Sequence, residues 1–391
     1  MMNTFRKIAL RELRRIEERK TLYLLMIIIP LLIFLFYGFI YNKELLRELP
    51  VAVYDADHSP LSQKICEQIE ATSSMRIVKY DYSLDEIKKD FFDGTIHGAF
   101  FIPRNLEKEI KEGKSTTVVV YKNTSNLIIG NTILKDASAV IRTVSAGAQL
   151  RKLRAKGMSY EKAMNIANPV RIETHSLFNP NYSYQNYLAP GLIAFTFQLL
   201  IMTASVIVIS SEFSHETFKE LMKLANDNPL MIFIGKAVPH FVIHTASALM
   251  IIGLVFPFFN IKIYGSSHLL IFFFMVFVAA CLNLGLFISS IIHDQLFATE
   301  ISVFINTPAF ILSGFTFPLS AMPIVHNTLA QMLPFTHFLN GLLKIYQMNG
   351  TFMDVWNETA ALGLFAVVSA LLTLFALKYQ INLYNKAAEV V

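Results

Sequence analysis

Six runs of about twenty apolar, almost uncharged residues constrain this chain more than any other feature of its sequence. A helix rises about 1.5 Å per residue, so each run can cross the roughly 30 Å hydrocarbon core of a bilayer. The chain of 391 residues is 54% hydrophobic and only 16% charged, as expected when lipid solvates much of it. We therefore predict spans at residues 21–41, 187–211, 237–259, 268–292, 296–316 and 359–377.

Basic residues beside these spans predict the topology. Twelve Lys and Arg residues flank the span ends on the side of the termini, whereas the short loops at the opposite ends carry only Lys262 and Lys344. Because positively charged flanks stay in the cytoplasm, we expect both termini on the cytoplasmic side. The membrane is expected to be the inner (cytoplasmic) membrane. The first run is too long, and its flank too charged, for a cleaved signal peptide, so it should remain as helix one.

The segment between the first two spans, residues 42–186, has the pattern of a separate domain. Strands are expected at residues 50–54, 76–80, 97–102 and 116–121, with helices between them, a helix over 127–168 that breaks near Gly157, and an extended piece at 170–175. Ser83 and Glu86 fit a capping box. The expected fold is a mainly α-helical polytopic membrane protein with six spans and an extracytoplasmic α/β domain inserted between helices 1 and 2.

Residues 1–20 predict a cytoplasmic amphipathic helix. Phe5, Ile8, Leu13 and Ile16 fall on one helical face, with Arg and Glu elsewhere. Such a helix can lie in the headgroup layer. A plain basic flank of the first span is the other interpretation, and both can hold together.

The loop between spans two and three predicts a cytoplasmic amphipathic helix over residues 212–226. Phe218, Leu221 and Met222 share one face, whereas Glu216 and Glu220 lie on the other. A helix of this kind can dock its apolar stripe into a groove of a soluble partner. The alternative is a connector that lies in solvent or on the membrane surface.

Polar residues also occur inside the apolar runs. Glu300 lies about one turn inside span five, where a carboxylate has either a substrate or gating role or a structural contact near the interface. His240 and His244 are one turn apart in span three. No third ligand of suitable spacing accompanies them, so neutral, hydrogen-bonded imidazoles are favoured over a metal site.

The stretch from residue 313 to 350 is apolar but broken by Gly314, Pro318, Pro323 and Pro334. Such a segment can enter the membrane only where protein or water satisfies its backbone. A re-entrant helical hairpin on the outer side, at residues 317–350, is one interpretation. An ordinary outer amphipathic loop is the other.

Motifs for catalysis and nucleotide binding are missing from the sequence. Gly235-Lys236 is followed by Ala237, so no P-loop is formed, and no Ser/His/Asp set or metal-ligand cluster occurs. We therefore expect no catalytic residue, no metal site and no cofactor on this chain, and no nucleic acid as partner. Cys66 and Cys281 are expected to be free thiols.

Three segments resemble the permease subunit of ABC-2 type transporters, and their order relative to six spans extends the resemblance over the whole chain. The run SEFSHETFKELM (residues 211–222), followed by Pro229-Leu230 and Gly235-Lys236, is similar to that family's coupling segment, although His215 and Phe218 depart from its usual residues. SGFTFP at 313–318, Met322-Pro323 and LPFTH at 333–337 look like its outer signature. VYDAD and SPLS at 53–62 match the start of the large outer domain found among bacterial multidrug-type exporters.

The resemblance implies a transport subunit rather than an enzyme. Such a permease pairs with a second copy or a related permease and docks on a separate ATP-binding subunit, which holds ATP and Mg; a periplasmic adaptor is a further partner to consider. It would move a hydrophobic or amphipathic substrate out of the cytoplasm or the bacterial inner membrane. The docking residues would be Glu212, Glu216, Thr217, Phe218, Glu220, Leu221, Met222 and Pro229. The substrate path or gate would include Glu300, Asn306, Phe315, Phe317, Pro318 and Pro334.

Two other classes of function are weighed against this interpretation. A membrane receptor or scaffold would bind a ligand through its outer domain without transporting it. A proton-driven carrier would use Glu300, but we see neither clear internal repeats nor charges near the bilayer midplane. A receptor would be expected to have a larger cytoplasmic region, so the transporter interpretation is favoured.

Overall fold

The structure is a computed structural model that describes residues 2–41, 47–168, 175, 177–179 and 183–389. It contains two compact units. One is formed by Met1–Glu44 with Ser176–Val391, and the other by Leu45–His175. The second unit is therefore inserted, in chain order, between the first two apolar helices. The extended piece predicted at residues 170–175 lies, apart from His175, outside the described residues.

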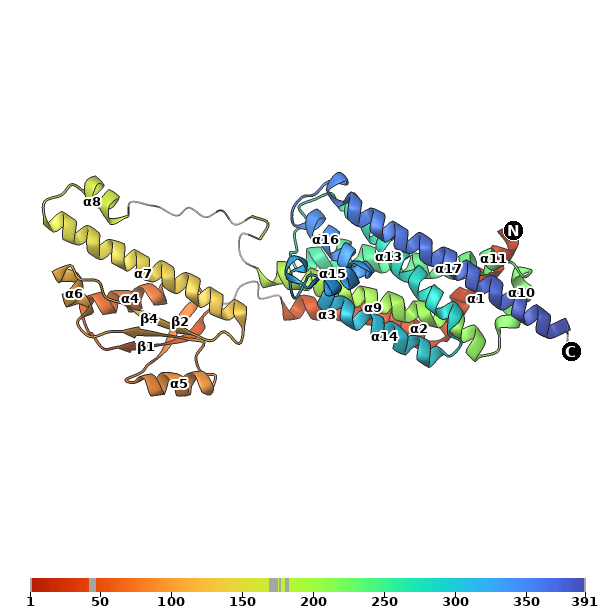
Figure 1. The fold of residues 1–391 in the computed structure, drawn as a ribbon, viewed down its shortest axis with the longest axis horizontal. Coiled ribbons are helices and arrows are strands. Elements are labelled where there is room, and N and C mark those ends of the chain that lie inside the picture. Colours follow the sequence, from red (N-terminus) through yellow and green to blue (C-terminus); the bar gives the residue numbers. More distant parts are fainter. Residues whose placement is uncertain (1, 42–46, 169–174, 176, 180–182, 390–391) are drawn as a thin grey trace. The chain divides into compact units, whose positions relative to one another are not determined.

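The larger unit is built from helices (Figure 1). It begins with α1 (Met2–Glu18), α2 (Lys20–Tyr23), the π-helical turn η1 (Leu24–Ile28) and α3 (Ile29–Ile40). After the inserted unit come α9 (Tyr184–Ser214), α10 (Phe218–Ala225), α11 (Pro229–Met250), η2 (Ile251–Val255), α12 (Phe256–Phe258), α13 (Ser267–Ile291) and α14 (Gln295–Leu312). The chain ends with η3 (Leu319–Ala321), α15 (Ile324–Gln331), α16 (Pro334–Tyr346), η4 (Met353–Val355) and α17 (Trp356–Glu389).

Six helical segments in the described residues are long and apolar enough to cross a membrane. They are Lys20–Ile40, Gln185–Ser214, Pro229–Phe258, Ser267–Ile291, Gln295–Leu312 and Met353–Lys386. The predicted number and order of spans are confirmed, and the chain is a multi-pass membrane protein. The second span starts before residue 187 because Ser183 caps it, accepting a hydrogen bond from the backbone N–H of Asn186.

Helices α9 and α13 form the centre of the helical unit. In their most apolar stretches 78% and 56% of the residues are buried, compared with 22–33% in the other four spans. Helix α13 packs against α9 and α17, and α9 also packs against α14 and α3. The peripheral helices expose large apolar side chains such as Phe36, Phe304 and Phe375. So many exposed apolar groups fit a surface solvated by lipid.

The stretch after α14 forms short helices, as its prolines predict. Gly314 has a φ of +89°, which turns the chain out of α14, and α15 is largely exposed. Helix α16 is tied to α13, since the Phe338 ring stacks on Phe277 and Phe273 with centroids 3.8 and 5.3 Å apart. A broken helical pair therefore exists here, and its entry into the bilayer remains a prediction.

The inserted unit is a small α/β sandwich. Its sheet has the order β2-β1-β3-β4, formed by β1 (Leu49–Asp55), β2 (Met75–Tyr80), β3 (Gly98–Ile102) and β4 (Val119–Lys122). Strand β1 pairs in parallel with β2 and β3, and β4 is antiparallel to β3. The helices are α4 (Pro60–Glu70), α5 (Leu84–Phe92), α6 (Leu106–Glu112), α7 (Leu127–Ala155) and α8 (Tyr160–Ala167).

Alternation along β1 sorts these helices onto two faces of the sheet. Val51 and Val53 point into the core shared with α4 and α7, whereas Ala52 belongs to the small core on the opposite face, beneath α5. The predicted strands and helices of this unit are all present, with ends shifted by at most three residues. Ser83 caps α5 as expected, accepting a hydrogen bond from the backbone N–H of Glu86. The predicted capping box is only half formed, because the Glu86 carboxylate accepts its hydrogen bond from the backbone N–H of Tyr82 and not from that of Ser83.

Candidate functional site

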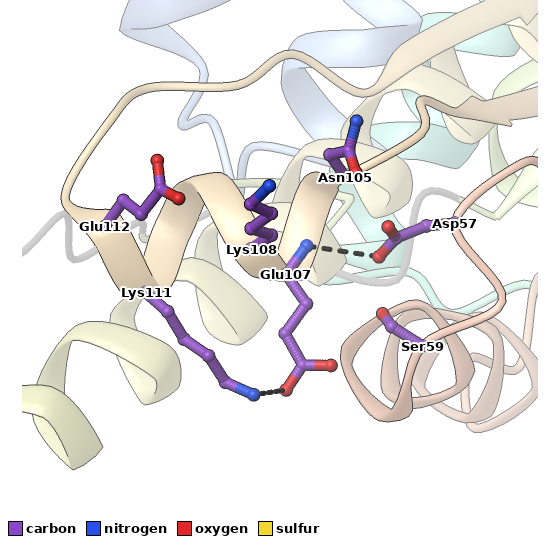
Figure 2. Close-up of a pocket in the computed structure, with 7 residues that line it drawn as sticks. All are labelled: Asp57, Ser59, Asn105, Glu107, Lys108, Lys111 and Glu112. Atoms are coloured by element: carbon purple, nitrogen blue, oxygen red, sulfur yellow. Dashed lines mark hydrogen bonds and ion pairs between the residues drawn. The ribbon is translucent and has the colours of Figure 1, made fainter.

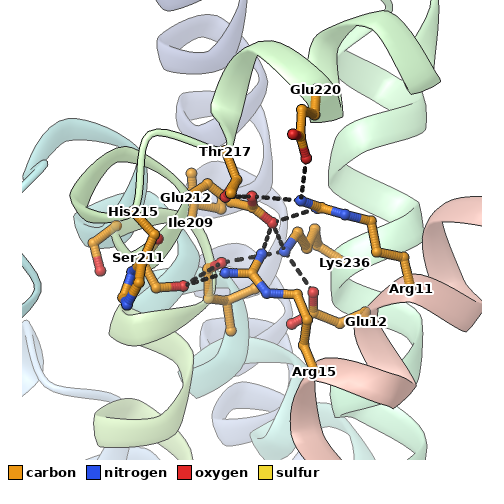
Figure 3. A network of polar contacts seen from close by, with 12 residues as sticks. Arg11, Glu12, Arg15, Ile209, Ser211, Glu212, His215, Thr217, Glu220 and Lys236 are labelled. Atoms are coloured by element: carbon orange, nitrogen blue, oxygen red, sulfur yellow. Dashed lines mark hydrogen bonds and ion pairs between the residues drawn. The ribbon is translucent and has the colours of Figure 1, made fainter. Parts of the chain in front are cut away.

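The candidate site is the segment that joins α9 to α11, together with the N-terminal helix α1 (Figure 3). Helix α9 ends just beyond Glu212, and Glu216 then takes a left-handed φ of 56° that lets the chain reverse into α10. The backbone N–H of Thr217 donates to the carbonyl of Glu212 over 2.9 Å, and its hydroxyl donates to the Glu212 carboxylate. Helix α10 is therefore fixed directly to the end of α9. It is shorter than the helix predicted over residues 212–226, because residues 212–214 form the last turn of α9 and α10 covers only Phe218–Ala225.

Glu212 is the centre of a buried ionic network. Its side chain is fully buried, and its two carboxylate oxygens accept hydrogen bonds from the Arg11 guanidinium, with N–O distances of 2.6 and 3.0 Å. Arg15 forms an ion pair with the same carboxylate and also donates to the Ser211 hydroxyl over 3.0 Å. Paired donors on one carboxylate are among the strong hydrogen bonds of proteins. They join α1 to the end of α9.

Lys236 extends the network to α11. Its buried ammonium lies 2.5 Å from a Glu212 oxygen and 2.5 Å from a Glu12 oxygen. The other Glu12 oxygen lies 3.0 Å from Nε2 of His240, one turn farther along α11. Glu12, only 1% exposed, therefore connects α1 to α11 through two partners.

Close packing of two helices brings these charges together. A Cβ atom added to Gly235 would lie 2.6 Å from a methyl carbon of Ile8, so only a glycine lets α1 approach α11 this closely. Ile8 and Ile16 are buried on the same face of α1 as Glu12. The adjacent Gly235 and Lys236 thus have separate roles: the glycine provides space for α1, and the lysine provides charge.

Ionisation of the network is maintained by its geometry. Burial alone would raise the pKa of Glu12, but the ion pair with Lys236 and the hydrogen bond with His240 outweigh it and hold that pKa well below its usual range. Burial lowers the pKa of Arg15 to about 10, so this guanidinium is still charged at neutral pH. Three cations, Arg11, Arg15 and Lys236, therefore surround two carboxylates.

The apolar face of α10 lies inside the protein. Phe218, Leu221 and Met222 are at most 5% exposed, and the Phe218 ring packs on Phe213 with centroids 4.4 Å apart. This apolar stripe is therefore not free to enter a groove of a partner, because the chain itself covers it. The exposed face of the segment carries His215 and its charged residues instead: Glu216, Lys219, Glu220, Lys223 and Asp227.

The C-terminal part of α17 supports this segment. The Tyr384 ring lies 5.3 Å from the Phe218 ring, and the Lys219 ammonium lies 5.9 Å above Tyr384. His293 stacks on Phe213 at 4.0 Å. Residues at the ends of α9, α13 and α17 thus hold the buried side of α10.

The remaining docking candidates fall into two groups. Glu216 and Glu220 are exposed, whereas Glu212 is fully buried and Thr217 and Pro229 are partly buried. Pro229 is the first residue of α11, after the N-cap Asn228. A docking role for the whole set remains a prediction, and the exposed members are the ones that a partner can contact.

The candidate residues for a substrate path or gate do not form one cluster. Asn306 is fully buried and accepts a hydrogen bond of 2.8 Å from Gln198, which joins α14 to α9. Glu300 is exposed on α14, where it lines a shallow hollow of about 730 Å³ with Phe304 and Thr307. Structural contact therefore accounts for Asn306, and Glu300 faces outward.

Residues of the outer signature are also divided between the core and the surface. Phe315 is 8% exposed and stacks on Tyr187, whose hydroxyl donates to the Phe315 carbonyl over 3.2 Å. Pro334 is buried as the first residue of α16. Phe317 and Pro318 are exposed. Their role in transport remains a prediction.

The inserted unit has a polar hollow at the carboxyl ends of β1 and β3 (Figure 2). One Asp57 oxygen accepts a hydrogen bond from the Glu107 backbone N–H over 3.1 Å, and the Glu107 carboxylate pairs with Lys111 at 2.7 Å. These contacts hold α6 beside the start of α4. The hollow is therefore explained by structure, and no ligand is assigned to it.

The sequence interpretation missed the partners of Glu212. By its pattern alone, the sequence indicates Arg11 and Arg15 as part of the basic cytoplasmic flank and Glu12 as part of the polar face of α1. Two signals were nevertheless present: a glutamate between Ile8 and Ile16 on the apolar face, and a lysine directly before the predicted third span, inside an apolar stretch that already starts at Pro229. His240 also has a structural explanation, since it contacts Glu12, and no group of three metal-binding side chains occurs in the part of the chain that the structure describes.

Removal of the central carboxylate should destabilise the helical unit. In Glu212→Ala, three cations lose a shared buried partner, and breaking a buried ion pair costs about 3–5 kcal/mol. Thermal unfolding of the purified chain in detergent measures this loss. Glu220→Ala is the matched control, because this glutamate is exposed and lies 4.0 Å from Arg11; it should change stability by less than about 0.5 kcal/mol. Equal melting temperatures for the two variants would contradict the network's role.

Gly235→Ala should loosen the contact between α1 and α11. Overpacking a tight contact costs about 1–3 kcal/mol. The control is Gly253→Ala, in the same apolar helix but with open space around its Cβ position, which should be neutral or slightly stabilising. Limited proteolysis of α1 and thermal unfolding measure the effect. If both variants behave like the original chain, the close approach is not required.

Known membrane permeases are similar to this chain in sequence. The sequence profile of the family described as "ABC-2 family transporter protein" matches residues 20–375. In Escherichia coli (strain K12), the "Probable multidrug ABC transporter permease YbhS" is 21% identical over 355 residues, which cover 87% of this chain and 88% of the relative. The "Inner membrane transport permease YhhJ" is 22% identical over 336 residues, 85% of each chain.

A third relative is similar over a shorter region. The "Probable multidrug ABC transporter permease YbhR" of the same organism is 29% identical over 195 residues, 49% of this chain, and the match spans about half (52%) of its length. The family profile, in contrast, covers most of the chain and includes parts of all six apolar helices. The chain therefore belongs to the ABC-2 family of transporter proteins.

Proposed function

We propose that this chain is the membrane permease subunit of an ATP-driven exporter of the bacterial inner membrane. It would move a hydrophobic or amphipathic substrate outward from the cytoplasm or the membrane itself. The family membership, the permease names of its relatives and the six apolar helices support this assignment. Because the sequence has no P-loop, ATP and Mg would bind to a separate subunit, and this chain would contribute no catalytic residue.

The network around Glu212 is the observation that carries the proposal. An ATP-binding subunit that pushes on α10 can drive transport only if α10 is rigidly joined to the spans. Glu212 provides that joint, since it contacts Thr217 before α10, Arg11 on α1 and Lys236 on α11. A displacement of α10 would therefore move three helices together, as allosteric coupling through packed elements requires.

The docking surface in this proposal is the charged face of α10. Glu216, Lys219, Glu220 and Lys223 are exposed, and no aromatic side chain of the segment is available. Charged faces provide orientation and partner choice, whereas buried apolar contacts provide most of the affinity. We therefore propose that the ATP-binding subunit supplies a groove for α10 and recognises this charge pattern.

The proposed topology places this docking surface in the cytoplasm. Basic flanks put both termini and α10 on the inner side, and the inserted α/β unit would then lie outside. There it could hand substrate to an envelope partner such as a periplasmic adaptor. Labelling of single cysteines with a membrane-impermeant reagent, at Lys223 and at Lys108, tests the two assignments.

A second permease, identical or related, completes the proposed exporter. Phe297 and Phe304 of α14 are 52% and 77% exposed, and Glu300 lies on the same outward side. A carboxylate directed at lipid is costly, so this face is the best candidate for contact with another permease. Substrate would pass between the two copies, along a path that includes Glu300 and the outer segment around Phe317.

The function is tested by purification of the chain from its host in mild detergent. We expect a P-loop ATPase to co-purify in a fixed ratio and the complex to hydrolyse ATP. Transport of candidate amphipathic compounds by reconstituted vesicles then tests export. A receptor or scaffold would instead bind ligands through its inserted unit without an associated ATPase.

The docking face gives a specific prediction. Exchange of two exposed charges by Glu216→Lys with Lys223→Glu keeps the net charge but inverts the pattern, so affinity for the ATP-binding subunit should fall on the order of 10-fold. Co-purification yield and surface plasmon resonance measure it. The control pair Arg104→Glu with Lys108→Glu, exposed on the inserted unit, should bind normally. Unchanged binding by the exchanged variant would remove this face from the interface.

A further inference from the structure

A hollow with basic walls lies between α1 and α10. Its volume is about 510 Å³. Five basic side chains and one carboxylate line it: Lys7, Arg11, Arg14, Arg15, Arg19 and Glu18. Lys7, Arg11, Arg14 and Glu18 follow the helical spacing of three or four residues, so they share one side of α1. The hollow is thus strongly positive.

The positive charge of this hollow is only partly balanced by the protein. Arg11 and Arg15 reach the Glu212 carboxylate, which they share with Lys236. For Lys7, Arg14 and Arg19, no ion pair or hydrogen bond of the side chain occurs within the described residues. Burial lowers the pKa of Arg19; the negative charge of Glu12 opposes this shift, and the positive charge of Arg11 adds to it to a smaller extent. An added anion would relieve this repulsion.

The position of the hollow along the chain indicates where that anion comes from. Helix α1 ends at Glu18, Arg19 has an extended backbone, and the first apolar helix begins at Lys20. The hollow therefore lies at the end of a membrane span, at the level of the lipid headgroups. Leu10, on its wall, and Leu13 are 47% and 44% exposed, which provides apolar surface beside the charges.

We propose that this hollow binds the phosphate headgroup of an anionic phospholipid. Arginine forms paired hydrogen bonds to phosphate oxygens, and basic groups at the membrane surface attract acidic lipids. Inorganic phosphate could make the same contacts, but a lipid also places its acyl chains against Leu10 and Leu13. These leucines favour lipid over an acidic segment of a protein partner. Lipid binding at this hollow does not depend on the proposed transport function. Only its assignment to the inner leaflet rests on the proposed topology.

Bound lipid would act on the ionic network around Glu212. The hollow shares Arg11 and Arg15 with Glu212 and shares Thr217 with the start of α10. A phosphate there would offset the excess of cations over carboxylates and hold α1 against α10. The lipid would therefore stabilise the joint that connects the docking helix to the spans.

The test uses the full chain, delipidated in mild detergent. Phosphatidylglycerol, phosphatidylcholine with the same acyl chains, and inorganic phosphate are added separately. Native mass spectrometry counts retained lipids, and thermal unfolding reports stabilisation. We expect retention and stabilisation with phosphatidylglycerol, and neither with phosphatidylcholine or with millimolar phosphate.

The variant pair is Lys7→Gln with Arg14→Gln. Both side chains are exposed and stand outside the Glu212 network, so folding should be unaffected. Affinity for phosphatidylglycerol should fall about 30-fold, since each basic residue near the surface contributes about 1 kcal/mol. Lys378→Gln with Lys386→Gln is the matched control, because it removes the same charge from exposed positions on α17; it should bind lipid normally.

Three results would overturn the proposal. Equal lipid binding by the two variant pairs would show that the hollow is not the site. Equal stabilisation by inorganic phosphate would make the ligand a free anion rather than a lipid. Weaker binding of the ATP-binding subunit by Lys7→Gln with Arg14→Gln, without any effect of phosphatidylglycerol, would assign the hollow to the protein partner.

Discussion

The structure depends on a buried carboxylate, Glu212, that has no access to water. Such a group is tolerated only when positive partners replace its hydration. Arg11, Arg15 and Lys236 do so, and they come from two helices that lie on opposite sides of Glu212 in the sequence. The cost of leaving this charge unpaired therefore holds α1, α9 and α11 in one arrangement. Gly235 makes the arrangement sterically possible, because α1 would otherwise be held away.

The same network explains how a helix as short as α10 can keep its shape. Eight residues are too few for a stable isolated helix, so tertiary contacts must hold it. Phe218 and Leu221 provide these contacts by packing into the protein, and Thr217 ties the first turn to Glu212. The apolar stripe that suggested a docking surface is therefore what fixes α10 to its own chain. In the proposed exporter, a partner would meet the polar face, and its force would reach a helix that is already anchored.

Length and periodicity predicted the fold well but the site only in part. Six apolar runs, and the alternation at Val51 and Val53, are local patterns that tertiary structure rarely overrides. The direction of the α10 stripe could not be read in this way, because amphipathicity shows that a face is buried but not by what. The Glu212 network was missed for a related reason. Arg11 and Arg15 carry the same charge that a cytoplasmic flank needs, and only their three-dimensional proximity to Glu212 reveals a second role.

Helix α9 connects the Glu212 network to distant parts of the helical unit. It has 31 residues, about 46 Å of helix, and is the most buried span. Glu212 lies near one end, Gln198 bonds to Asn306 of α14 in its middle part, and Tyr187 contacts Phe315 near the other end. Polar contacts of this kind inside a bilayer resist separation, since the alternative is an unsatisfied group in hydrocarbon. A movement imposed on α10 at its base would therefore be shared by α14 and by the segment around Phe315. In this way α9, as one rigid helix, can link the proposed docking surface to the opposite end of the bundle.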